Sequence, residues 1–129
     1  MLKISGPTLI LIGVIHTLFG LIGGYSTWKE MAQIGFIDSV GSRIPHSSMI
    51  FWFTFVGPMT ILIGHLCVRI EGILQRPLPL FIGIELFILS TIGVVLDGPD
   101  SGFWLVLATA VNMIVAGKRA QNASIASVQ

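Results

Sequence analysis

Four apolar stretches, each about as long as a bilayer is thick, fill most of this 129-residue chain. They cover residues 7–25, 48–68, 79–96 and 102–117. A helix needs roughly 17 to 25 residues to cross about 30 Å of hydrocarbon, and the last stretch reaches that length only if its helix continues through Ser101 and Lys118. Strands of a barrel alternate in polarity, and these runs are too long and too uniformly apolar for that pattern. The sequence therefore predicts an all-α integral membrane four-helix bundle.

Composition supports a membrane protein and excludes several other classes. Hydrophobic residues make up 53% of the chain and charged residues 10%, and the mean hydropathy is +0.91, whereas about a quarter of the residues of a soluble domain are charged. The Lys and Arg residues are scattered and form no stripe, so we expect no nucleic-acid partner. Cys67 is the single cysteine, which excludes an internal disulfide and a cysteine-based metal cage. We predict no metal site.

Chain length limits the organisation of the protein. Residues 1–129 give room for one membrane domain, and four short helices enclose little volume without bound lipid, a ligand or a second copy. We therefore expect a homo-oligomer, with a dimer as the default. The connections near Pro77 and Gly98 are short, and short connections join antiparallel neighbours. The bundle is thus predicted to run up and down.

The segment between the first two spans, residues 26–47, has a pattern of its own. Thr27 to Glu30 resembles a capping box, and Trp28, Met31 and Ala32 form one apolar face. We expect a short interfacial helix on the outer membrane surface. A partly ordered loop is the alternative. The polar tail, residues 120–129, is expected to be frayed.

The cations are unequally divided between the two sides of the membrane. Five fall on one side and two on the other, namely Lys3, Arg69, Arg76, Lys118 and Arg119 against Lys29 and Arg43. Cytoplasmic loops carry the excess of Lys and Arg. Both termini are therefore predicted to be cytoplasmic.

Glu85 and His16 are polar residues that a lipid environment makes costly. A charged carboxylate deep in a span costs on the order of 3 kcal/mol, so Glu85 should be neutral or face a partner inside the protein. His16 lies on a face with Gly13, Gly20 and either Gly23 or Gly24, where another helix or a flat cofactor could approach the backbone. Structural roles, as hydrogen-bonding residues between helices, are the alternative for both.

Depth along the spans suggests which polar residues meet. With about 1.5 Å of rise per residue, His16 lies near the midplane, Glu85 and Asn112 about 4 Å to the cytoplasmic side, and His65 about 10 Å down. An amide can donate to a carboxylate and accept from an imidazole. We therefore predict a proton-handling, candidate catalytic site formed by His16, Glu85 and Asn112, with His65 structural or interfacial.

Such a site would suit an apolar or amphipathic small molecule, such as a lipid, that enters from the bilayer. Two titratable groups in different environments can support acid–base chemistry. These residues leave open whether the protein only binds the molecule or also converts it.

Three other functions stay open. The cofactor is unknown, and a b-type haem could take His16 and His65 as axial ligands, with Gly13, Gly20 and Gly64 making space for the porphyrin. A proton-coupled transporter could use Glu85 within a dimer. A structural or regulatory partner of another membrane protein is the last alternative.

Three short patterns resemble a family of small, uncharacterised four-span bacterial proteins. They are Gly13-Val14-Ile15-His16-Thr17-Leu18-Phe19-Gly20, Phe51-Trp52-Phe53, and Gly98-Pro99-Asp100-Ser101-Gly102-Phe103-Trp104-Leu105. The resemblance covers nearly the whole chain. It implies a multi-pass protein of the bacterial inner membrane and no particular activity.

Overall fold

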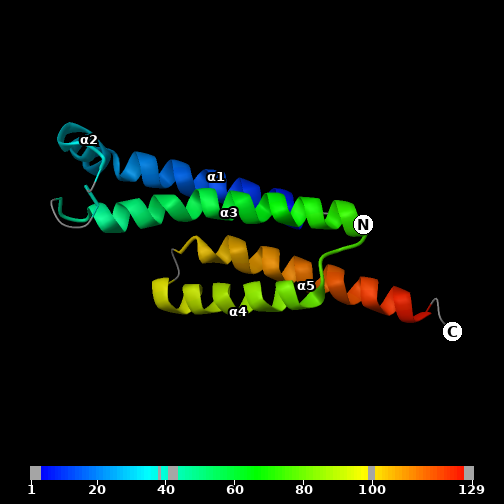
Figure 1. The fold of residues 1–129 in the computed structure, drawn as a ribbon. Coiled ribbons are helices and arrows are strands. Elements are labelled where there is room, and N and C mark those ends of the chain that lie inside the picture. Colours follow the sequence, from blue (N-terminus) through cyan, green and yellow to red (C-terminus); the bar gives the residue numbers. More distant parts are fainter. Residues whose placement is uncertain (1–3, 38, 41–43, 99–100, 127–129) are drawn as a thin grey trace. The chain divides into compact units, whose positions relative to one another are not determined.

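A computed structural model describes residues 4–37, 39–40, 44–98 and 101–126. The elements are α1 (Ser5–Gly23), α2 (Tyr25–Ile34), α3 (Ser47–Leu74), α4 (Leu80–Asp97) and α5 (Phe103–Ala126) (Figure 1). The described residues contain no strand, so the predicted all-α class is confirmed. Four helices, α1, α3, α4 and α5, are long and apolar enough to cross a bilayer.

The surface of these helices is suited to lipid. Large apolar side chains are exposed along every one of the four spans, with Ile22 75%, Ile73 80% and Leu96 81% accessible. A soluble monomer rarely exposes such continuous apolar surface. The exposed faces therefore agree with the hydropathy of the sequence.

Contacts between residues divide the chain into two compact units. The α2 unit comprises Leu11–Leu62, and the α4–α5 unit comprises Met1–Ile10 together with Ile63–Gln129. Both α1 and α3 contribute residues to each unit.

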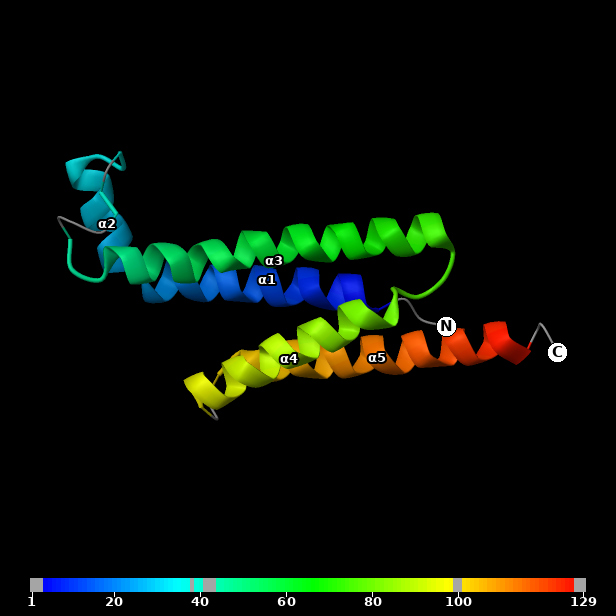
Figure 2. The ribbon, with the colours of Figure 1, turned by 60° about the horizontal axis from the view of Figure 1, so that its bottom comes forward.

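In the α2 unit, the end of α1 pairs with the beginning of α3, and α2 turns away from the axis of α1 (Figure 2). Met31 on α2 is buried, at 1% exposure, and the indole Nε1 of Trp28 donates to the carbonyl of Gly20 over 3.3 Å. The predicted short helix after the first span is thus present, with an apolar side that contacts protein.

The predicted capping box is wrong. The helix starts at Tyr25 with Gly24 at its N-cap and without a side-chain capping bond, so Thr27 is already inside the first turn. The backbone N–H of Trp28 bonds to the carbonyl of Gly24 over 2.9 Å. The backbone therefore continues into α2 almost directly from α1, and no side-chain cap is needed.

In the α4–α5 unit, α4 and α5 lie side by side and antiparallel (Figures 1 and 2). Gly83 permits this approach, because a methyl group there would lie 3.0 Å from the Cβ of Met113. The helix α4 ends where Gly98 adopts a φ of 86°, and the N–H of Gly98 donates to the carbonyl of Val94. The buried core of the unit consists of Leu9, Cys67, Leu78 and Met113, with Ile82 and Leu86 packed against it.

Two helices extend beyond the spans expected from hydropathy. The helix α5 continues to Ala126, so most of the tail expected to be frayed is helical. Residues 120–126 include three Ala and one Gln, which are good helix formers. The helix α3 continues to Leu74. Of the residues used in the sequence predictions, Lys3, Arg43, Pro99 and Asp100 lie outside the described residues, as do 127–129 of the polar tail.

Candidate functional site

His16 is held on α1 by a contact with α3. Its Nε2 atom lies 2.9 Å from the carbonyl oxygen of Phe53, and the two rings stack with centroids 4.2 Å apart. A carbonyl can only accept, so Nε2 carries the proton and donates. In the neutral ring, Nδ1 is then the nitrogen that can accept a proton or a hydrogen bond. The contact therefore orients this imidazole and favours the tautomer with its proton on Nε2.

Glycines bring the two helices close enough for that contact. A methyl group at Gly13 would lie 2.6 Å from the carbonyl oxygen of Gly57. One at Gly20 would collide with Thr54, and one at Gly57 with Thr17. The small-residue face predicted on the first span thus receives another helix, α3, which is the common use of such a face within a membrane.

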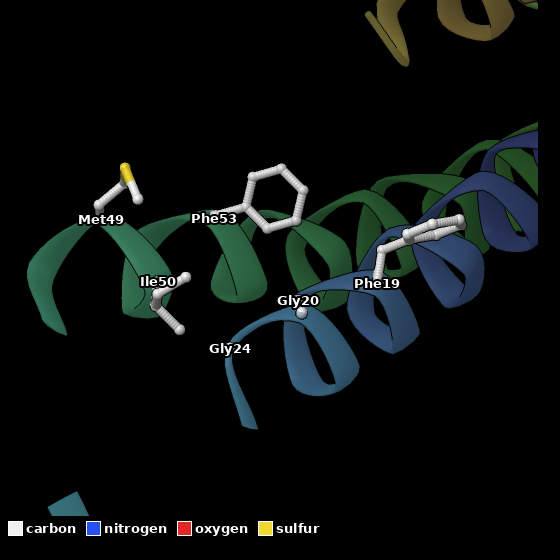
Figure 3. Close-up of a pocket in the computed structure, with 7 residues that line it drawn as sticks. Phe19, Gly20, Gly24, Met49, Ile50 and Phe53 are labelled. Carbon is white, nitrogen blue, oxygen red and sulfur yellow. The ribbon is translucent and has the colours of Figure 1, made fainter. Parts of the chain in front are cut away.

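An apolar groove opens beside this contact. It is lined by two aromatic rings, two other apolar side chains and three glycines, namely Phe19, Gly20, Gly23, Gly24, Met49, Ile50 and Phe53, and its volume is about 300 Å³. Figure 3 shows Met49, Ile50 and Phe53 on α3, with Phe19 and Gly20 on α1. We call it the Phe19–Phe53 groove. His16 is its neighbour, because the imidazole stacks on the Phe53 ring.

Gly23 differs from the other glycines of the groove. A methyl group at Gly23 would meet nothing within 4 Å, whereas one at Gly24 would collide with Ile50. Gly23 lines the groove, and a larger side chain at this position would start in open space without separating the helices.

The other two residues of the predicted site belong to the α4–α5 unit. The Asn112 amide donates to the hydroxyl of Ser5 over 3.2 Å, and Ser5 is buried. Glu85 is exposed on α4, so it does not face α5 as Gly83 does. The interior position predicted for this carboxylate is therefore not found within the α4–α5 pair. The meeting of His16, Glu85 and Asn112 stays a prediction.

The arrangement of His16 and the glycines does not suit a porphyrin. The Nε2 atom of His16 is engaged by the Phe53 carbonyl, and His65 is exposed on α3. The three glycines expected to make space for the ring instead face helix atoms: Gly13 faces Gly57 and Ile61, Gly20 faces Thr54, and Gly64 faces Ile10. Among the described residues, no group of three His, Cys, Asp or Glu side chains could hold a metal ion.

Sequence reasoning missed Glu71 as a buried carboxylate. This residue is 4% exposed on α3, beyond the point where the second span was expected to end. It continues a stripe of buried positions through Gly64 and Cys67. That helical spacing of three and four residues was the available signal. No comparable sequence pattern predicts the apolar groove, because Phe, Met and Ile occur throughout the spans.

These helices define a class: the chain is a multi-pass helical membrane protein. It belongs to DUF6463, a family of unknown function, whose sequence model matches residues 1–120. Membership of an uncharacterised family, expected from the short patterns, is thus confirmed. No curated protein gives a match, and neither does any solved structure.

Proposed function

We propose that this membrane protein binds an apolar or amphipathic small molecule, of the size of a lipid acyl chain, in the Phe19–Phe53 groove. The observation that carries the proposal is a groove of about 300 Å³ lined by apolar residues and glycine. Pockets for small molecules have volumes of roughly 300–1,000 Å³ and mostly apolar walls. The groove is at the small end of that range, which suits one chain.

The position of the groove favours an amphipathic molecule. Its lining residues come from the last turns of α1 and the first turns of α3. Ends of spanning helices lie near the headgroups, and the helix that follows, α2, carries the exposed charges of Lys29 and Glu30. An apolar tail in the groove would place a polar headgroup close to this charged surface.

His16 acts in this proposal as a positioning residue with a titratable nitrogen. Its ring and its hydrogen bond hold the Phe53 wall of the groove. Since Nε2 donates to Phe53, Nδ1 is the atom that would accept a proton from a bound molecule. The acid–base part of the proposal therefore depends on His16 and does not require Glu85 or Asn112.

We further propose that the protein lies in a bacterial inner membrane with both termini in the cytoplasm. The five cations assigned to the terminal side include Arg69, Arg76, Lys118 and Arg119, all of which are exposed. The positive-inside rule supports this orientation.

Photolabelling tests the groove. The probe is a palmitic acid with a diazirine on its chain, added to the purified protein in lipid nanodiscs. We expect labelled peptides from 19–24 and 49–53, and we expect Gly23→Leu to lower that labelling at least fivefold because the leucine fills the groove. Native mass spectrometry of the unlabelled protein would show whether lipid is retained.

Gly72→Leu is the matched control. Gly72 is also a helical glycine with nothing within 4 Å of an added methyl group, and it does not line the groove. Its labelling should equal that of the wild type. Labelling that is spread over all lipid-facing helices, or that Gly23→Leu leaves unchanged, would refute the proposed function.

A further inference from the structure

We propose that two copies of this chain form a parallel dimer in which Glu85 of one copy pairs with His65 of the other, twice across a two-fold axis. Both residues of the proposed pair belong to the α4–α5 unit, and neither lines the groove. Both side chains are titratable and face outward. Glu85 on α4 and His65 on α3 are exposed, and among the described residues no hydrogen bond or ion pair joins them.

Outward-facing polar groups in a spanning helix need a partner. The exposed neighbours of Glu85 one turn away are Phe81 at 58% and Leu89 at 64% exposure, and those of His65 include Leu62 at 53%. Lipid tails offer these groups no hydrogen bond, so an unpaired carboxylate on such a face is costly. A carboxylate and an imidazole complement each other as acceptor and donor.

In a parallel dimer, two residues that pair across the interface must lie at the same depth in the membrane. Copies inserted in the same direction are related by a two-fold axis along the membrane normal, and that rotation leaves the depth of every residue unchanged. Glu85 can therefore reach His65 of a second copy only if both lie at the same depth within one chain.

Contacts within the α4–α5 unit show which residues share a level. A methyl group at Gly6 would lie 2.9 Å from the carbonyl oxygen of Gly64, which places these two side by side. Ser5, the residue before Gly6, accepts a hydrogen bond from Asn112 over 3.2 Å. Gly64 and Asn112 therefore lie at the same depth along the helix axes, to within about the rise of one residue.

The same chain of contacts leads to Glu85. Met113, the residue after Asn112, lies against Gly83, whose added methyl group would be 3.0 Å from its Cβ. Glu85 follows Gly83 by two residues, and His65 follows Gly64 by one. At about 1.5 Å of rise per residue, Glu85 and His65 then differ in depth by roughly one helical turn at most. Their side chains are long enough to span that difference, so the two residues match in depth, as the proposed parallel dimer requires.

Cross-linking between two tagged chains tests the pair. In a Cys67→Ala background, one chain carries Glu85→Cys and a longer tag, and the other carries His65→Cys. A thiol-to-thiol cross-linker of side-chain length is added to membranes that contain both. We expect a mixed dimer band as the main product. The Cys67→Ala chain alone should give no cross-linked product. In size-exclusion chromatography it should elute at the same volume as the wild type.

Val115→Cys is the control, because Val115 is exposed on α5 but lies outside the proposed pair. It should cross-link to neither partner. A product formed mainly between two Glu85→Cys chains would overturn the pairing, as would the absence of any mixed product. A product with the mass of another membrane protein would instead assign the surface to that protein.

A dilution series of intact chains gives a second, independent measurement. In detergent micelles, Glu85→Ala and His65→Ala should each raise the dimer dissociation constant roughly tenfold, since two polar contacts between helices are lost in each. The exchanged double variant Glu85→His with His65→Glu should recover most of that loss. Val115→Ala should leave the constant unchanged. If the single variants dimerise as the wild type does, or if the exchange recovers nothing, the proposed pair is wrong.

Discussion

Gly13 and Gly23 lie on the same helix but differ in what a methyl group would meet. At Gly13 the added atom would be 2.6 Å from a backbone oxygen of α3, whereas at Gly23 it would meet nothing. Backbone cannot move aside as a flexible side chain can. We therefore expect Gly13→Ala to lower the free energy of unfolding by about 1–3 kcal/mol, the usual cost of overpacking.

Gly23→Ala is the control for that prediction. Alanine has the higher helix propensity, so this variant should be neutral or more stable by up to about 1 kcal/mol. Unfolding of both variants in mixtures of mild detergent and dodecyl sulfate, followed by circular dichroism, measures the difference. Equal stability of the two would mean that Gly13 does not set the distance between α1 and α3.

At the scale of an element, α2 is held by its buried side rather than by a cap. Met31 is 1% exposed, and Ile34 on the same helix is 47% exposed. Truncation of a buried methionine to alanine typically costs about 2–5 kcal/mol. We expect Met31→Ala to release α2, which would increase hydrogen exchange of the amides between Tyr25 and Ile34.

The exchange rates of α3 should change little in the same variant, since the effect is local. Ile34→Ala removes a similar apolar side chain from an exposed position and should leave exchange in α2 as it is in the wild type. Protection of α2 that survives Met31→Ala would show that the hydrogen bond from Trp28 to Gly20 suffices to hold the helix.

For the whole molecule, we propose that each of the four described helices that are long and apolar enough to cross a bilayer does cross it, which places both termini on one side of the membrane. The excess of cations on that side predicts that it is the cytoplasm. In a bacterial host, green fluorescent protein fused after Gln129 should therefore fluoresce, because it matures in the cytoplasm.

Alkaline phosphatase, which is active outside the inner membrane, reports the opposite side. A fusion after Phe36 should be active and a fusion after Arg76 inactive. The reverse pattern would invert the proposed orientation, and activity at both positions would contradict the spanning role of α3.

The sequence predicted those features that depend on residues close together in the chain. Hydropathy and the lack of backbone partners in lipid determine that residues 7–25, 48–68, 79–96 and 102–117 form helices, and each of these stretches is helical over most of its length. The residues at which the helices end were harder to predict from the sequence. The helix α3 runs on to Leu74, past the predicted end of the second span at Val68, and Glu71 was overlooked because it lies in that extension.

Only the tertiary structure decided which faces meet. A glycine at position 13 and one at position 23 are equivalent in sequence, yet α3 covers the first and leaves the second beside an open groove. The exposed position of Glu85 and the hydrogen bond from His16 to Phe53 were likewise decided by the tertiary structure. Composition and periodicity act along one segment and establish that a helix forms and crosses the membrane. The direction in which each side chain then points to a neighbour depends on packing between segments far apart in the chain.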